Sequence, residues 1–362
     1  MARFRPSRDW INDPNGLIVH GGLWHLFFQT NPEGVDWGTM SWGHATSPDL
    51  ATWTEHAVAL PCTAEEQIFS GSVVHDVANT SGLGRDGVAP LVAVYTSHYS
   101  PGSPRHGTQA QSLASSTDGG FTWTPFPGNP VLTRGTPDFR DPKVFREAGG
   151  WTMVVVEAAD HLVLRYRSPD LRAWTLDGWL RVPGEGLVEC PDVFPLAIEG
   201  ELHEVLLVSV GPVAPGRGTG MRYTIDPVWR QGEPDPTDLG ETPWPLLDHG
   251  PDCYAGTTFN DAPDGRRIFL AWMSNWDYAA VMVDPSLVAG PFSVFVAGDD
   301  SDARGRAAGL IAELGHTDIV DLGALTAARG LEMFLPLWLS LMQSMGSANF
   351  GVLLQRPAQS TA

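Results

Sequence analysis

Three acidic residues in the N-terminal part of the chain could supply carboxylate chemistry. Asp13 and Asp141 are each followed directly by a proline and, eight positions on, by a glycine pair. Glu189 precedes a third unit, in which Asp192 has the same spacing to Gly200. Clustered carboxylates can provide a nucleophile and a proton donor. A single aspartate before proline or glycine is more often a turn former, so chemistry requires a fold that brings these acids together.

A repeated unit surrounds the acids. Each unit consists of an acid, an apolar run, a glycine turn and a second apolar run, which is the pattern of a β-hairpin. A second pattern occurs at residues 47–53 and again at residues 168–174, with a looser copy at residues 116–123. Each copy ends in tryptophan. Sheets of this size arranged radially form a β-propeller, in which equivalent strand ends meet near the axis. We therefore expect Asp13 and Asp141 to converge; a β-sandwich with repeated hairpins is the alternative.

Composition agrees with an all-β fold. The 362 residues include 40 Gly, 30 Pro and 14 Trp, as expected for many tight turns. The net charge of −20 argues against nucleic acid and against an anionic membrane surface as partners. The 3 cysteines are too few and too scattered for a disulfide framework or a zinc site. His25, His44, His75 and His98 lack metal-ligand spacing, so we expect no metal and no cofactor.

Ordered motifs identify a family. Residues 10–16, 27–32, 69–72, 139–142, 189–192, 252–255 and 272–276 resemble, in this order, the motifs of glycoside hydrolase family 32, which contains invertases, inulinases and levanases. The resemblance covers residues 4–279. It implies a five-bladed β-propeller and a retaining β-fructofuranosidase that hydrolyses terminal fructosyl bonds in inulin, levan and sucrose. Fructose-containing oligosaccharides would then be the substrates.

The resemblance also implies residue roles. Asp13 would be the nucleophile, and Glu189 would protonate the leaving oxygen and then activate water, as retaining hydrolysis requires. Asp141 would stabilise the transition state, with Arg140 beside it. The sugar pocket would be lined by Asn12, Gln29, Trp37, Phe69, Ser70, Asp252 and Trp272. Crowding and burial should raise at least one carboxyl pKa in the cluster, and Glu189 should be the raised one, whereas donors such as Asn12 should keep Asp13 ionised.

After residue 278 the pattern departs from the family. A strand at 293–298, a helix at 302–314, a strand at 318–322 and a helix at 326–345 predict a β-α-β-α tail. Residues 295–300, 321–323 and 327–332 resemble the C-terminal part of NADP-dependent oxidoreductases related to the deazaflavin-cofactor reductases. This tail has no G-x-G-x-x-G phosphate loop of its own, so the Rossmann-like fragment is not expected to bind a dinucleotide. We therefore divide the chain into domains 1–280 and 281–362.

The junction leaves an alternative function open. A propeller without its last strands would have an open blade with unpaired edges and an incompletely closed ring. The chain could then be a weak or inert fructan-binding propeller from a chimeric gene, whereas the intact acids favour an enzyme. The N-terminus lacks the apolar segment of a secretory signal, which indicates a cytoplasmic protein, although a start further upstream could make it secreted. The oligomeric state is open.

Overall fold

The computed structural model describes residues 4–7, 9–211, 219–235, 243–250, 252–276, 293–313, 316–327, 337, 341, 344 and 345. The chain forms two compact units, Met1–Asn275 and Trp276–Ala362. The division predicted from the sequence, at residue 280, lies a few residues later. Among the described residues, no helix has the length and apolar character needed to cross a membrane.

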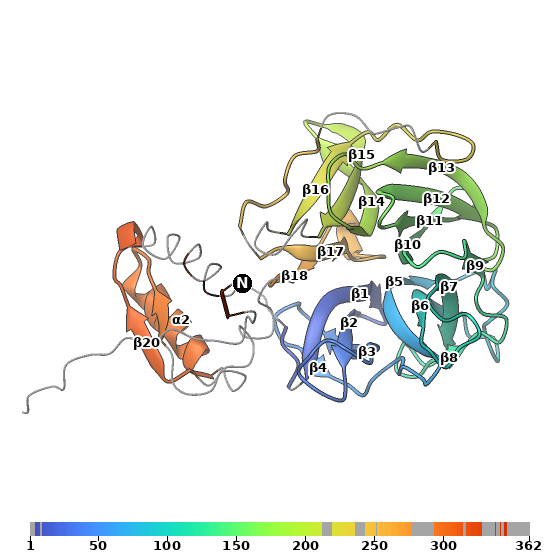
Figure 1. Ribbon diagram of the computed structural model, residues 1–362. Helices are drawn as coiled ribbons and strands as arrows, with labels where there is room; N and C mark the ends of the chain where they lie inside the picture. The colour runs from blue at the N-terminus through green and yellow to red at the C-terminus, as the bar shows by residue number, and fades with distance from the viewer. Residues whose placement is uncertain are drawn as a thin grey trace, which may run out of the picture. The chain divides into compact units, whose positions relative to one another are not determined.

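Among the described residues of the first unit, five antiparallel sheets follow one another along the chain (Figure 1). The first contains β1 (Trp10–His20), β2 (Leu23–Asn31), β3 (Ser41–Ser47) and β4 (Thr54–Glu55). The second contains β5 (Glu66–His75), β6 (Leu91–Tyr99), β7 (Gln109–Ser116) and β8 (Thr124–Pro125), with β9 (Leu132–Thr133) paired to β7. The third contains β10 (Phe139–Glu147), β11 (Gly150–Glu157), β12 (Leu162–Ser168) and β13 (Thr175–Arg181). The fourth contains β14 (Val188–Ile198), β15 (Glu201–Val210) and β16 (Gly220–Ile225), and the fifth β17 (Tyr254–Thr258) and β18 (Phe269–Trp272). A 3₁₀ turn, η1 (Pro263–Gly265), precedes β18.

Turn residues fix these sheets. Gly21 and Gly22 have φ of 59° and 80° and join β1 to β2 as a two-residue hairpin, a geometry that positive φ allows. The three tryptophan-ended repeats form similar turns. Asp49 accepts backbone bonds from residues 51 and 52, Asp118 from residues 121 and 122, and Asp170 from residues 172 and 173. The predicted hairpins and the second repeat are confirmed.

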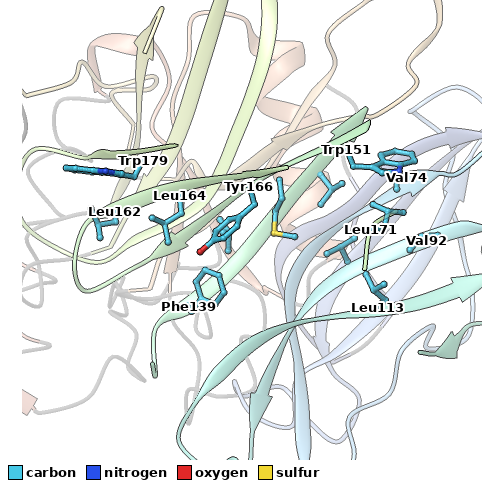
Figure 2. Packing of buried hydrophobic residues seen from close by; sticks show 14 residues of the cluster. Val74, Val92, Leu113, Phe139, Trp151, Leu162, Leu164, Tyr166, Leu171 and Trp179 are labelled. Carbon is cyan, nitrogen blue, oxygen red and sulfur yellow. The ribbon is translucent and has the colours of Figure 1, made fainter. Parts of the chain in front are cut away.

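Apolar side chains fill the space between consecutive sheets. Figure 2 shows one such cluster, in which Val74, Val92 and Leu113 of the second sheet pack against the third sheet. The third sheet contributes Phe139, Trp151, Leu162, Leu164, Tyr166 and Trp179. A fully buried side chain of this size contributes about 1.5–3 kcal/mol, so this face-to-face packing fixes the sheets around a common axis.

The first strands of the five sheets form a closed cycle. β1 contacts β5, β5 contacts β10, β10 contacts β14, β14 contacts β17, and β17 contacts β1. Asn260, just after β17, closes the cycle, because its N–H donates to the carbonyl of Leu17 (2.9 Å) and its carbonyl accepts from the N–H of Val19 (3.0 Å). The architecture is therefore an all-β, propeller-like ring. The sequence predicted a ring that is incompletely closed, but the inner strands of the described residues contact one another around the whole cycle. The fifth sheet has only two strands among the described residues.

The second unit contains a β-α-β element. β19 (Ser293–Val296) and β20 (Asp318–Asp321) pair in parallel and are connected by α2 (Ser301–Glu313), and η3 (Leu325–Ala327) follows. Asp300 caps α2, since its Oδ1 accepts the N–H groups of Asp302 and Ala303. Both predicted strands and the first predicted helix are confirmed. Most of the predicted helix 326–345 lies outside the described residues, and the likeness to oxidoreductases stays a prediction.

Histidines are buried in the first sheet. His25 Nδ1 lies 3.1 Å from His44 Nε2, and the His44 ring stacks on Phe27. Burial lowers the pKa of His25 to about 4 and that of His44 to about 3. The unfolded chain therefore binds more protons than the folded chain below about pH 6.5. The free energy of unfolding is therefore highest above about pH 6.5 and decreases as the pH falls toward the folded-state pKa values of the two histidines. The decrease is up to about 1.4 kcal/mol per pH unit for each histidine.

We expect His44→Phe to reduce this acid sensitivity, because phenylalanine fills the stacked position without binding a proton. The measurement is the free energy of unfolding in urea between pH 4.5 and 7.5. The difference between the two proteins isolates the histidine from the carboxylates elsewhere. Parallel stability curves for the wild type and His44→Phe would show that the histidine pair is not the source of the slope.

Candidate active site

The predicted acids lie at bulges of the inner strands. The strand register shifts between Ile11 and Pro14, between Arg140 and Lys143, and between Glu189 and Asp192. β5 and β17 have shifts at Phe69/Gly71 and Tyr254/Thr257. A proline lacks the N–H that would continue the ladder, and prolines 14, 142 and 191 lie in three of these bulges. The bulges direct neighbouring side chains of different sheets toward the axis.

Asp13 is buried and held by two donors. The Ser70 hydroxyl of β5 donates to Asp13 Oδ2 over 2.6 Å, and Asn12 Nδ2 donates to Oδ1 over 3.0 Å. The indole of Trp10 donates to Asn12 Oδ1 (2.7 Å), which orients the Asn12 amide. Asn12 and Ser70 therefore contact the predicted nucleophile directly, as expected for members of one site.

A cysteine connects Asp13 to Asp141. Cys190 Sγ lies 3.6 Å from Oδ2 of Asp13 and 3.6 Å from Oδ2 of Asp141. The Cys190 N–H also donates to Asp141 Oδ2 (2.9 Å), and the Asp141 N–H donates to Thr96 Oγ1 (2.9 Å). Side chains of β1, β10 and β14 thus converge on one sulfur atom, across the long sequence separation that the repeat predicted.

Arg140 connects Asp141 to Glu189. Its Nε lies 4.0 Å from Asp141 Oδ2, and both its Nε and its Nη2 lie 3.1 Å from Glu189 Oε1. The other oxygen of Glu189 accepts a hydrogen bond from the Tyr254 hydroxyl of β17. The Glu189 side chain is 19% exposed, whereas Asp141 is 6% exposed. Glu189 is therefore the member of this pair that solvent or a substrate can reach more easily.

Burial sets the acidity of the cluster. It raises the pKa of Asp13 to about 6 and that of Asp141 to about 7, because desolvation disfavours the charged form. Ser70 and Asn12 lower the pKa of Asp13 by hydrogen bonding, but they do not cancel the desolvation. The prediction of at least one raised pKa in the cluster is confirmed for Asp13 and Asp141. The expectation for Glu189 stays a prediction, and the donors expected to keep Asp13 ionised do not hold its pKa at the ordinary value. The sequence shows the donors but not the depth of burial.

The aromatic residues predicted to line the pocket lie on two sides of the cluster. Phe69 stacks on His98 with ring centroids 4.6 Å apart, and Trp37 approaches the edge of Phe69 at 6.0 Å. Trp272 lies between Trp10 (6.1 Å) and Tyr254 (6.5 Å). Phe69 precedes Ser70, which donates to Asp13, and Trp272 contacts Tyr254, which donates to Glu189. Both aromatic groups therefore lie beside residues that contact the carboxylates.

Gln29 and Asp252 are placed by other contacts. Gln29 is buried on β2 and its Nε2 donates to the carbonyl of Ile68 (3.0 Å), next to Phe69 and Ser70. Asp252 accepts a hydrogen bond from Asn275 Nδ2 (3.0 Å). A direct role of Gln29 and Asp252 in sugar binding stays a prediction.

Sequence reasoning did not assign Tyr254 or Thr96 to the site. Burial and the neighbouring Glu189 raise the pKa of Tyr254 well above its ordinary value, so its hydroxyl remains a donor. A signal for Tyr254 was available, because it occupies the bulge position in β17 that Arg140 and Glu189 occupy in β10 and β14. Cys190 lies within the motif at residues 189–192, in which the family resemblance assigns a role only to Glu189. Thr96 lies on β6, which contains none of the family motifs, and no sequence signal pointed to it.

Metal binding depends on which side chains lie close together in the described part of the chain. Among the residues that the structure describes, no group of three or more histidine, cysteine, aspartate or glutamate side chains could hold a metal ion. The cluster instead offers carboxylates, an arginine, a thiol and a phenol. Such a set can perform nucleophilic and acid–base chemistry without a cofactor.

Comparison with known proteins decides the family. The family model described as the N-terminal domain of glycosyl hydrolases family 32 matches residues 3–289. This chain belongs to glycosyl hydrolase family 32. The resemblance inferred from the motifs is confirmed, whereas almost all of the β-α-β tail lies beyond the matched residues.

Curated relatives of this family 32 chain include a levanase of Bacillus subtilis, 43% identical over 290 residues, and an extracellular exo-inulinase of Aspergillus niger, 38% identical over 310 residues. The matches cover 76% of this chain but 41% and 57% of the relatives. Among solved structures, exo-inulinase from Aspergillus awamori has a TM-score of 0.70 and 37% identity, covering 77% of this chain and 60% of that one. The chain thus spans about two fifths to three fifths of the length of these proteins.

Proposed function

We propose that the chain is a retaining β-fructofuranosidase that hydrolyses terminal fructosyl bonds in inulin, levan and sucrose. The observation that carries this proposal is the convergence of Asp13, Asp141 and Glu189 through Cys190 and Arg140. The named activities of the levanase and exo-inulinase relatives support it. So does a β-fructofuranosidase of Schwanniomyces occidentalis, solved in complex with fructosyl-erythritol, with a TM-score of 0.69 and 36% identity.

The reaction would use the two ends of the cluster. Asp13 attacks the anomeric carbon of the terminal fructose while Glu189 protonates the leaving oxygen, which forms a fructosyl-enzyme ester and releases the rest of the substrate. Glu189 then takes a proton from water, and the resulting attack on the anomeric carbon frees Asp13. Arg140 and the Tyr254 hydroxyl hold the two oxygens of Glu189 during both transfers.

Asp141 would act without forming a bond to the sugar. Its pKa of about 7 lets it bind sugar hydroxyls either as an acceptor or, when protonated, as a donor. The oxocarbenium-like transition state is stabilised by the negative charge that Asp13 and Asp141 carry between them. The furanose would lie against Phe69 and Trp37, since aromatic rings commonly form the apolar wall of a small polar-ligand site.

We also propose that the fifth sheet is the fifth blade of the propeller. Its inner strand β17 occupies the place between β14 and β1 and carries Tyr254 to the cluster. The observation favouring an inert fructan-binding module is the small size of this sheet, which has two strands among the described residues.

Fructose release decides between the two functions. The purified chain is incubated with inulin, levan and sucrose, and free fructose is measured beside an Asp13→Ala control. We expect release by the wild type and none by the control. Binding of inulin without release by the wild type would support the inert module and contradict the enzyme.

Ser70→Ala should move the pH profile of kcat/KM. Asp13 must be ionised to attack, so with its pKa of about 6 the rate falls about tenfold per unit below pH 6. The Ser70 hydroxyl lowers the pKa of Asp13, and its removal should shift the acidic limb to higher pH and reduce the rate about tenfold at pH 5.5. An unmoved acidic limb in Ser70→Ala would mean that another group controls it.

A further inference from the structure

Polar residues just past the bulges of four inner strands lie next to the carboxylate cluster. This axial layer consists of Asn15, Lys143, Asp192 and Thr257. Its two charged members are buried, with Lys143 6% exposed and Asp192 0% exposed. The reaction proposed above uses neither of them, although burying charge is costly.

Lys143 and Asp192 join three sheets. Lys143 Nζ lies 3.5 Å from Asp192 Oδ2 and donates to the carbonyl of Thr258 (2.5 Å). Asp192 Oδ2 in turn accepts from the Thr258 N–H (2.6 Å) and from the Thr257 hydroxyl (3.1 Å). One ion pair therefore connects β10 and β14 and fixes the backbone of β17 to both.

Each strand that the pair connects carries a residue in the left-handed region just before the anchor. φ is 63° at Asp141, 48° at Cys190 and 52° at Ala255. Side-chain-bearing residues adopt this conformation only where the surroundings enforce it. Lys143 and Asp192 lie two residues after Asp141 and Cys190, so the ion pair fixes the C-terminal side of the strained bulges that present the site.

The ion pair is separated from the place of reaction. A cavity of about 20 Å³, enough for about one water molecule, is lined by Ser70, Asp141 and Cys190 of the site and by Asn15, Lys143 and Thr257 of the axial layer. A sugar does not fit there, so Lys143 and Asp192 do not contact the substrate through this cavity. They act on the site through the strands that they hold and through their charges, which the double variant below removes as a neutral pair.

We propose that Lys143 and Asp192 are positioning residues that hold the bulges of β10, β14 and β17 in the geometry required for proton transfer by Glu189. This inference rests on the proposed function. β17 has a single partner strand among the described residues, β18, so the ion pair supplies anchoring that a larger sheet would provide. Asp13 takes its two shorter hydrogen bonds from β1 and β5, which the ion pair does not join, and it contacts β14 through the Cys190 sulfur at 3.6 Å.

The double variant Lys143→Met/Asp192→Asn tests the inference. It removes one positive and one negative charge, so the net charge is unchanged and neither buried partner is left alone. We expect kcat on sucrose to fall at least about tenfold, and the basic limb of the pH profile to move. KM and the acidic limb, which Asp13 controls, should stay within about twofold and about 0.3 pH units (order-of-magnitude expectations). Arg267 is the other charged group that acts on Lys143 and Asp192. The groups that face Glu189 are Arg140, Tyr254, Asp13 and Asp141.

A matched variant controls for lost stability. Arg134→Met/Glu157→Gln removes a partly buried ion pair of 2.7 Å, in which Glu157 is 3% and Arg134 28% exposed and neither residue belongs to a bulge. We expect this control to lower Tm without moving either limb of the pH profile. The inference is wrong if the axial double variant keeps the wild-type kcat and pH profile. It is also wrong if the activity of this variant falls only in proportion to the fraction of protein that is unfolded, because the ion pair would then be merely structural.

A chemical measurement tests the inference without using activity. Cys190 is buried in the β14 bulge, and the other free cysteines are Cys62 and Cys253. In a Cys62→Ser/Cys253→Ser background, we expect the axial double variant to speed modification of Cys190 by a thiol reagent at least about tenfold, as bulge opening exposes the sulfur. An unchanged modification rate would overturn the inference even for an active enzyme. Absence of fructose release by the wild type would instead contradict the proposed function.

Discussion

Asp13→Asn is expected to abolish hydrolysis and at the same time to stabilise the fold above neutral pH. Asparagine preserves the shape of the side chain and can still accept the Ser70 hydroxyl, but its amide cannot form the fructosyl ester. Removing a catalytic nucleophile lowers kcat by at least about 10⁴-fold. Inulin, levan and sucrose should all be affected, because the same attack precedes release of each leaving group.

The stability gain follows from the pKa of Asp13. Burial raises that pKa from 3.8 to about 6, so the folded state holds the proton more tightly than the unfolded state. The resulting stability is fully present below about pH 3.8 and is lost as the pH rises through 6. A shift of about two units corresponds to about 3 kcal/mol, and Asp13→Asn avoids this loss. We therefore expect a higher Tm than wild type at pH 8 and a similar Tm at pH 4.

Asp76→Asn provides a control of opposite sign. Asp76 is buried at the end of the second sheet's first hairpin strand, and hydrogen bonds from Ser81 and Thr80 outweigh burial and lower its pKa. This variant should lose stability at pH 8 and keep its specific activity. Equal Tm changes in the two variants at pH 8 would contradict the electrostatic account of Asp13, and residual activity of Asp13→Asn above 1 part in about 10³ would contradict its role as nucleophile.

The sequence was sufficient for the convergence of Asp13 and Asp141, because hairpin turns and a repeat are local signals. Gly21, Gly22 and the turn aspartates determine their own backbone geometry within a few residues. Once the sheets are radial, equivalent strand ends must meet near the axis. The predicted contact of Asp13 with its neighbours across the ring needed no further information.

The alignment of the third repeat was wrong by two residues for a physical reason. Counting back from the glycine turn matched Asp192 with Asp13 and Asp141, but the bulges place Asp192 with Lys143 and place Cys190 with Asp141. The β14–β15 hairpin is longer than the β10–β11 hairpin, so the turn is a poor reference point. The proline after each bulge residue is the better one, because it marks the interrupted ladder itself.

The pKa values could not be predicted, since they depend on burial that no single motif encodes. Asn12 was expected to donate to Asp13 and Ser70 to line the sugar pocket, and both lower the pKa of Asp13. The larger effect comes from desolvation by the surrounding sheets, which is a property of the whole ring. The same holds for Lys143, whose partners lie on β14 and β17 and are distant in sequence.

The largest remaining prediction concerns the proton donor. Glu189→Gln keeps a side chain that can contact Arg140 and Tyr254, but it can neither protonate the leaving oxygen nor activate water. We expect kcat on sucrose to fall about 10³-fold or more. An aryl fructoside with a good leaving group needs no protonation, so Glu189→Gln should still form the fructosyl ester on Asp13 and release the aryl alcohol in a burst.

Azide distinguishes Glu189 from Asp13. As a small nucleophile that needs no general base, azide should attack the accumulated ester in Glu189→Gln, release fructosyl azide and restore turnover of the aryl fructoside. It should not rescue Asp13→Asn, which forms no ester. Rescue of both variants, or of neither, would contradict the assignment, because only a donor that also acts as the base for water gives an intermediate that waits for an external nucleophile.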